Sequence, residues 1–154
     1  MFLVRSFAGR RAHESPCLAL SFLLLFNPST NAPNNKASKG NASAVRATVT
    51  NYIEGYFTGD AQRMEQTLHT HYLKHVIHAD TQMDEIIGRQ VMKNVRREGK
   101  PDLPAASKTE KVTVLDIAGD IASAKLVTPG WTDYMTLSKV NGEWKILSVV
   151  QRID

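Results

Sequence analysis

The sequence predicts an α+β domain in which helices cover one face of an antiparallel sheet. Between residues 44 and 97 apolar side chains recur mainly at helical spacing. From residue 108 onward the pattern changes to a period of two, with β-branched residues separated by tight turns. A run of helices followed by a run of strands is typical of α+β domains.

Three helices are expected before the sheet. The first spans residues 44–58, with Ser43 as its N-cap and Gly59 at its end. Asp60 should cap a second, shorter helix, and a third is expected over residues 84–97. The segment 69–79 between them should be extended. The apolar positions of the three helices are Val45, Val49, Tyr52, Ile53, Tyr56, then Met64 and Leu68, then Ile87, Val91 and Val95.

Three turns fix the expected register of the sheet. They are Gly119-Asp120, Pro129-Gly130 and Asn141-Gly142, the last being a strong hairpin signal. If each is a two-residue loop, Asp133 lies opposite Leu126 and Val150, and opposed residues share a face. The inner face then holds Leu115, Ile117, Ala122, Ala124, Leu126, Trp131, Asp133, Met135, Leu137, Trp144, Ile146 and Val150. The outer face carries apolar side chains that favour a homodimer packed through it, namely Val112, Val114, Tyr134, Leu147 and Val149.

Residues 1–43 are interpreted as a signal-like leader and a disordered linker, with the domain spanning 44–154. Arg5, Arg10 and Arg11 precede an apolar run over 17–26, which is shorter than the roughly 20 residues of a stable membrane span. This order is typical of a secretory signal and predicts a periplasmic or secreted protein. If translation starts later, the leader is an artefact and the domain is cytoplasmic. An uncleaved amphipathic anchor and an organelle presequence are further alternatives.

The charge distribution argues against nucleic-acid binding. The chain has a net charge of +4, but residues 44–154 contain 14 basic and 14 acidic side chains, so the excess lies in the leader. Phosphate contacts need a concentrated positive face, which this domain lacks. The only cysteine, Cys17, is also in the leader, which excludes disulfides, cysteine-ligated zinc and a thiol nucleophile within the domain.

Several short segments, taken in order, resemble one known family. They are Tyr52-Ile53-Glu54-Gly55-Tyr56, Gly59-Asp60, Leu68-His69, Lys74, Val112-Thr113-Val114-Leu115-Asp116, Ala122-Ser123-Ala124-Lys125, Asp133-Tyr134, Leu137, Lys139 and Gly142-Glu143-Trp144-Lys145-Ile146. Over residues 44–150 the chain resembles the putative lumazine-binding family of the nuclear transport factor 2-like superfamily. It departs from that pattern at His71, near where proline is common, and at Gln151, where tryptophan is common.

The resemblance implies a cone-shaped α+β fold, with helices closing a strongly curved sheet around a pocket. It also implies a homodimer, since superfamily members are often dimeric. These members include ketosteroid-isomerase-like and polyketide-cyclase-like enzymes, non-catalytic binders and association domains. Lumazine binding does not follow from the family's name, because a fold does not fix a function.

Asp133 is the sharpest candidate for chemistry. On an apolar face its carboxylate would be desolvated, which raises the pKa. A carboxylate with a raised pKa suits a general base that removes a proton from carbon. The alternative is a structural aspartate, hydrogen-bonded to a backbone donor or a helix N-terminus.

His69 is a second catalytic candidate, as an acid or base at the pocket mouth, although it could equally be a capping or core histidine. Lys74 could hold an anionic ligand or could simply be a surface cation. Tyr56 could bring a hydroxyl to the pocket from the first helix. The remaining candidate ligand contacts face inward and would line or fill the cone: Trp131, Met135 and Trp144.

Four histidines lie close together in the sequence, at positions 69, 71, 75 and 78. Their spacing does not match the usual metal-ligand patterns, so no metal and no other cofactor is expected.

The sequence therefore predicts a domain that binds a small apolar or aromatic molecule, with Asp133 at the polar end of the pocket. One alternative is an isomerase-, cyclase- or dehydratase-like enzyme that uses Asp133 as base, with His69 or a tyrosine as its partner. The other is a non-catalytic association module whose cone is filled by side chains. Both the binder and the enzyme require an open cavity that Asp133 faces.

Overall fold

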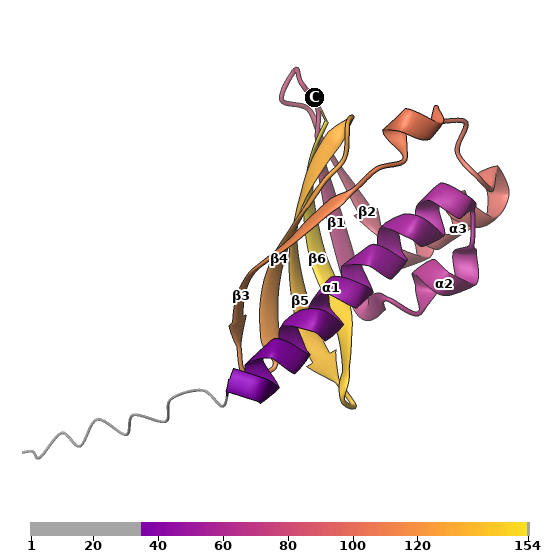
Figure 1. Ribbon diagram of the computed structural model, residues 1–154. Helices are drawn as coiled ribbons and strands as arrows, with labels where there is room; N and C mark the ends of the chain where they lie inside the picture. The colour runs from indigo at the N-terminus through magenta and orange to yellow at the C-terminus, as the bar shows by residue number, and fades with distance from the viewer. Residues whose placement is uncertain (1–34, 154) are drawn as a thin grey trace, which may run out of the picture. The chain divides into compact units, whose positions relative to one another are not determined.

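The computed structural model describes residues 35–153, and these form the predicted α+β fold (Figure 1). Three helices, α1 (Asn35–Thr58), α2 (Ala61–Glu65) and α3 (Gly88–Glu98), pack against one face of a six-stranded sheet. The strands are β1 (Leu68–Ile77), β2 (Met83–Ile87), β3 (Lys111–Ala118), β4 (Ile121–Val127), β5 (Trp131–Val140) and β6 (Glu143–Ile153), and a short 3-10 helix, η1 (Ala105–Ser107), precedes β3. Their order in the sheet is β2-β1-β6-β5-β4-β3. Every pairing is antiparallel except β1 with β6, which is parallel.

Helix α1 is longer than predicted. Residues 35–43 are helical, so the expected linker over this stretch and the N-cap role of Ser43 are both wrong. A tertiary contact holds this part of the helix, because Lys139 Nζ of β5 donates a hydrogen bond to Asn41 Oδ1 at 3.2 Å. The polar composition that suggested a linker carries no information about such a contact. The signal-like segment of the leader lies outside the described residues, and the localisation stays a prediction.

The second helix is as predicted, and the third is only partly so. The Asp60 carboxylate accepts a hydrogen bond from the backbone N–H of Arg63 at 2.9 Å, which is a standard N-cap. The helix expected from residue 84 begins at Gly88, because residues 83–87 instead form strand β2 and pair with β1. The helical spacing of Ile87, Val91 and Val95 did not distinguish a short edge strand before Gly88 from a first helical turn.

The predicted hairpin turns are correct, and two β-bulges alter the register beyond them. Asn141 and Gly142 both have positive φ, as a type I′ turn requires, and Asp133 lies opposite Leu126 as expected. On β6, Leu137 pairs with Ile146, but Thr136 pairs with Ser148, so Leu147 is an extra residue. A similar bulge in β3 lies at Leu115. Each bulge shifts the strand beyond it by one residue and so exchanges its two faces.

The bulges correct several predicted face assignments. Val149 and Val112 are buried, whereas Val150 and Leu115 are exposed, the reverse of the prediction in all four cases. Of the outer-face residues used to infer a homodimer, Tyr134 remains clearly exposed. The homodimer stays a prediction.

The core is filled at one end of the sheet. Trp144, Leu137 and Ile146 are buried there beneath the middle of α1, where Val45 and Val49 are also fully buried. Thr48 Oγ1 lies within hydrogen-bond distance of the Trp144 carbonyl at 3.3 Å and of the Ala44 carbonyl of its own helix at 3.1 Å, so the helix contacts the sheet at this end. The C-terminal end of the same helix covers the other end of the sheet, where a cavity lies between the helix and the strands.

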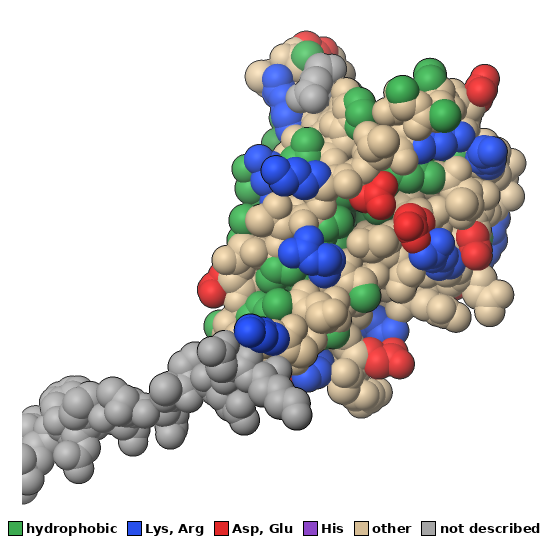
Figure 2. Space-filling model, viewed as in Figure 1, with side chains coloured by type: hydrophobic (Ala, Val, Ile, Leu, Met, Phe, Trp, Pro, Cys, Tyr) green, Lys and Arg blue, Asp and Glu red, His purple; other side chains and the backbone are tan. Residues whose placement is uncertain are grey.

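The surface carries charges of both signs. On the face shown in Figure 2, lysine and arginine side chains are scattered together with aspartate and glutamate side chains. Within residues 35–153, no helix combines the length and the apolar character that crossing a membrane requires.

Candidate functional site

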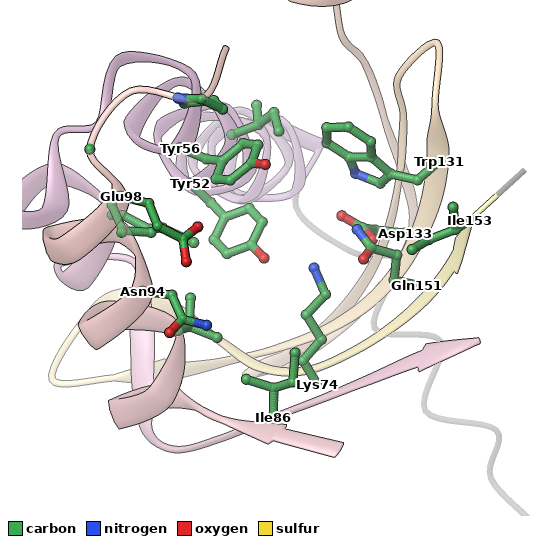
Figure 3. Close-up of a pocket in the computed structure, with 16 residues that line it drawn as sticks. Tyr52, Tyr56, Lys74, Ile86, Asn94, Glu98, Trp131, Asp133, Gln151 and Ile153 are labelled. Carbon is green, nitrogen blue, oxygen red and sulfur yellow. The ribbon is translucent and has the colours of Figure 1, made fainter. Parts of the chain in front are cut away.

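A cavity of about 310 Å³ lies between the helices and the sheet. The C-terminal half of α1 and helix α3 form one side of it, and strands β1, β2, β5 and β6 form the other (Figure 3). Most of the lining is apolar, and the aliphatic and ring side chains in it are Ile53, Met64, Ile86, Val91, Val95, Pro101, Trp131 and Ile153. The polar side chains among the lining residues are Tyr52, Tyr56, Lys74, Asn94, Glu98, Asp133 and Gln151, and polar groups set within a mainly apolar lining are typical of small-molecule sites.

Asp133 is the buried acid of this cavity. Its side chain is 0% exposed, and neither carboxylate oxygen makes a hydrogen bond of ordinary geometry with another described residue. Burial raises the pKa of Asp133, and the charge of Lys74 and the nearby Gln151 and Trp131 side chains offset that rise only in part. A buried polar group without partners is costly, so this carboxylate is poised to accept a donor or to hold a proton.

Lys74 extends from β1 toward Asp133 (Figure 3). Among the described residues, no ion pair within 4 Å and no hydrogen bond holds its ammonium group. Burial lowers the pKa of Lys74, and the charge of Asp133 opposes this shift. The pKa of the acid and the pKa of the base are therefore displaced toward each other, which makes proton exchange between cavity groups easier.

Three tyrosines supply hydroxyl groups at or near the cavity. The Tyr52 and Tyr72 hydroxyls are 3.2 Å apart, and burial raises the pKa of both, with the charge of Asp133 adding to the rise. Burial and Glu98 also raise the pKa of Tyr56. All three therefore remain protonated donors. Tyr56 also packs edge-on against Trp131, with ring centroids 6.0 Å apart.

Helix α3 contributes polar residues that the sequence prediction missed. Asn94 and Glu98 line the cavity from the side opposite Asp133 (Figure 3). Together with Val91 and Val95 they follow the i, i+3, i+4, i+7 spacing of one helix face. That periodicity was present in the sequence and could have indicated them.

Gln151 was missed for a different reason. In the predicted register Val150 faced inward beside Asp133, but the bulge at Leu147 places Gln151 opposite Asp133 instead. Its amide then faces the carboxylate across the strand pair (Figure 3). No sequence signal marked the bulge.

Four of the predicted site residues, Asp133, Lys74, Tyr56 and Trp131, line the cavity, and the other three lie elsewhere. Met135 and Trp144 are buried in the filled end of the core, so they are absent from the cavity lining. His69 is the second residue of β1, its Nδ1 accepts a hydrogen bond from the backbone N–H of His71, and it is not among the lining residues of the cavity. Its predicted place at the pocket mouth is wrong, because the second helix ends at Glu65 and the chain is already a strand there.

The remaining histidines form pairs along the β1–β2 edge. His78 contacts Asp84 at 2.9 Å and His75 lies 3.5 Å from Glu85. Within the part of the chain that the structure describes, no three histidine, cysteine or acidic side chains are arranged to hold a metal ion.

Residues 40–151 match the sequence profile of the family described as putative lumazine-binding. The chain belongs to the putative lumazine-binding family. This match covers the whole sheet except its last residues and all the helices beyond the start of α1. No protein with a curated description matches the chain.

Solved structures show the shared nuclear transport factor 2-like fold. An NTF2-like protein of unknown function from Silicibacter pomeroyi is 17% identical with a TM-score of 0.63, covering 76% of this chain and 98% of that one. A second, from Shewanella baltica, is 21% identical with a TM-score of 0.60, covering 73% and 93%. A ketosteroid isomerase-like protein from Erwinia carotovora atroseptica is 10% identical with a TM-score of 0.55, covering 73% and 95%. At these identities the likeness establishes the fold.

Proposed function

We propose that this putative lumazine-binding protein binds a small, flat, largely apolar molecule in the cavity, with a polar edge directed at Asp133. The observation that supports the proposal is Asp133, a lining residue of the cavity whose buried carboxylate oxygens make no hydrogen bond of ordinary geometry with another described residue. A ligand N–H or O–H would satisfy an otherwise costly group, which links affinity to this residue.

The size and chemistry of the cavity limit the ligand. A volume of about 310 Å³ is at the lower end of the range for small-molecule sites, and corresponds to roughly ten water molecules at about 30 Å³ each. Trp131 and Tyr56 offer aromatic surfaces, while Lys74 and Gln151 can donate to a ligand carbonyl beside Asp133. A ligand of one or two rings that carries adjacent N–H and C=O groups matches this volume, these aromatic surfaces and these hydrogen-bonding groups. Lumazine, which the family's name suggests, has such an edge and belongs among the compounds tested.

A second candidate is an isomerase-, cyclase- or dehydratase-like activity. It is favoured by one observation: Asp133, with a raised pKa, and Tyr52, a protonated donor, line the same cavity. Asp133 would remove a proton from carbon, and the tyrosine would stabilise the resulting oxyanion. Turnover of a bound carbonyl compound would distinguish this activity from binding alone.

The open cavity argues against a pure association module. That alternative required Trp131, Met135 and Trp144 to fill the cone together. Trp131 instead lines open space, while the other two fill only the opposite end.

A thermal-shift screen of the full chain tests the proposal. The compounds are lumazine and sets of aromatic, steroid-like and polyketide-like molecules, and the key variant is Asp133→Asn. We expect at least one compound to raise the melting temperature of the native protein and to lose most of that effect in the variant.

Asp116→Asn is the matched control, because Asp116 is an exposed aspartate on β3 far from the cavity lining. It should respond to ligands as the native protein does. The proposal is wrong if no compound binds, or if a ligand stabilises Asp133→Asn as strongly as the native protein.

A further inference from the structure

Lys74 is set apart from the other described lysines by its place in the cavity lining, since exposed lysines such as Lys93 and Lys111 also lack a hydrogen bond or ion pair with a described residue. Lys145 Nζ bonds to Glu143 at 2.7 Å and to the carbonyl of Gln66 at 2.6 Å, and Lys139 Nζ donates to Asn41. Lys125 lies over the ring of Tyr134 at 5.2 Å. Lys74 Nζ has none of these contacts with a described residue, and it is the only lysine among the lining residues of the cavity (Figure 3).

We infer that Lys74 forms a reversible imine with a carbonyl-bearing ligand held in this cavity. The inference deepens the proposed function, on which it rests, by narrowing the ligands of one or two rings to those that carry an aldehyde or ketone group, because the carbonyl of an amide-like N–H and C=O edge does not form an imine. It rests on geometry: an amine without an ion-pair partner projects into a largely apolar space beside a carboxyl group and a phenol. Imine formation needs a nucleophilic amine and nearby groups that donate and accept protons, and these three groups supply them.

The step balances without an oxidant, a reductant or a metal. The neutral amine nitrogen of Lys74 attacks the carbonyl carbon, and its proton passes to the carbonyl oxygen, giving a carbinolamine. The oxygen then receives a proton from Asp133 and leaves as water as the C–O bond breaks and the C=N bond forms. The nitrogen's remaining proton then passes to the Asp133 carboxylate, which leaves a neutral imine. The products are one imine and one water, and hydrolysis reverses the step.

Cavity groups can carry the protons that this step moves. Asp133 can give a proton to the departing oxygen and then accept the proton that the nitrogen releases, and hydrolysis runs through the same transfers in reverse. Tyr52, which stays protonated, can donate a hydrogen bond to the carbonyl oxygen during the attack.

The charge state of Lys74 depends on every titratable group that faces it. Desolvation favours the neutral amine, and Asp133 in its charged form favours the ammonium. Tyr52, Tyr56 and Glu98 line the same cavity, and the tyrosines remain neutral. The neutral, nucleophilic amine should therefore persist to lower pH at Lys74 than at exposed lysines.

Reductive trapping tests the inference on the full chain. The protein is incubated with benzaldehyde and sodium cyanoborohydride, and the benzylated lysines are located by peptide mass spectrometry across pH 5 to 9. Exposed Lys93 and Lys111 are internal comparators. We expect Lys74 to react first at pH 7, at least about tenfold faster than either comparator, because burial lowers its pKa and leaves more of its amine neutral.

Two variants and a non-carbonyl analogue complete the test. Lys74→Arg keeps the charge but cannot form the imine, so it should lose the fast-reacting site while Lys93 labelling is unchanged. Lys74→Gln is a second variant in case arginine does not fit. Benzyl alcohol, which has no carbonyl, should occupy the cavity and slow the labelling of Lys74.

The outcomes separate the two proposals. Labelling of Lys74 no faster than that of Lys93 overturns the imine inference. If benzyl alcohol still changes Trp131 fluorescence saturably in a Trp144→Phe variant in that case, the cavity binds ligands without covalent chemistry and the proposed function stands. If it does not, both proposals fail for this ligand class.

Discussion

The two ends of this sheet differ in what lies beneath the helices. At one end Trp144, Leu137 and Ile146 fill the space against α1, and at the other Asp133 and its neighbours surround a cavity. The bulged residue Leu147 of β6 lies between the two ends. It exchanges the faces of the strand beyond it, so that Val149 packs into the core and Gln151 faces the cavity. A single inserted residue therefore lies between the end of the sheet that is packed with apolar side chains and the end that lines the cavity.

The largest expected change in unfolding free energy tests whether the bulge at Leu147 is present. Val149 is 0% exposed and Val150 is 43% exposed, although both are valines on one strand. Val149→Asp should cost more than about 4 kcal/mol of unfolding free energy, because it buries an unpaired charge, whereas Val150→Asp should stay within about 0.5 kcal/mol. Urea denaturation of the two variants measures this. Equal losses would show that β6 has no register shift.

The next largest effect is the difference in unfolding free energy between alanine variants of the two tryptophans. Trp144→Ala should lower the unfolding free energy by about 3–5 kcal/mol, because Trp144 is buried in the filled end. Trp131→Ala should cost only about 1–2 kcal/mol, since part of that ring faces the cavity, but it should weaken ligand binding strongly. Denaturation and ligand titration of both variants give the comparison. A more stable Trp144→Ala than Trp131→Ala would reverse the assignment of the two ends.

A smaller effect follows from the pKa of Asp133, which burial raises. The native protein is then destabilised as the pH rises from the carboxyl group's unfolded pKa through its higher folded pKa. Asp133→Asn cannot ionise, so above that window it should be more stable than the native protein by on the order of 1–3 kcal/mol. The difference should vanish below about pH 4. Denaturation midpoints across this range decide the sign, and a variant that is less stable at pH 7 would show that the carboxylate stabilises the fold.

The smallest effect concerns Gln151. Gln151→Leu removes a donor near Asp133 while keeping the side-chain size, so it should raise the pKa of Asp133 further. Affinity for a ligand that binds Asp133 should fall by about 0.5–1.5 kcal/mol, the usual net value of one hydrogen bond. Isothermal titration measures it, with Arg152→Leu on the exposed face as the control. Unchanged affinity would place Gln151 outside the binding site.

Local signals in the sequence were sufficient for much of the fold. The Asn141-Gly142 turn and the alternation around it gave the correct pairing of β5 with the first part of β6, and Asp60 gave the start of α2. They also placed Asp133 correctly on the inner face, since β4 and β5 pair without a bulge. These features depend on neighbouring residues and on one tight turn.

The features that were missed depend on distant contacts. Strand β2 exists because it pairs with β1, and residues 35–43 are helical where Asn41 meets Lys139. Gln151 enters the site only through the bulge, which local propensity does not encode. His69 was expected at the pocket because of its neighbours in the sequence, but the strand directs it elsewhere.

The most direct test of the hollow, ligand-binding end is a fluorescence titration of Trp131. In a Trp144→Phe background, Trp131 is the only tryptophan, and it lies in the cavity lining. The best compound from the thermal-shift screen should change its emission saturably, and adding Asp133→Asn should weaken that binding at least about tenfold, which corresponds to 1.4 kcal/mol. Binding that leaves Trp131 emission unchanged, or that is equally tight without the Asp133 carboxylate, would contradict the assignment of this cavity as the functional site.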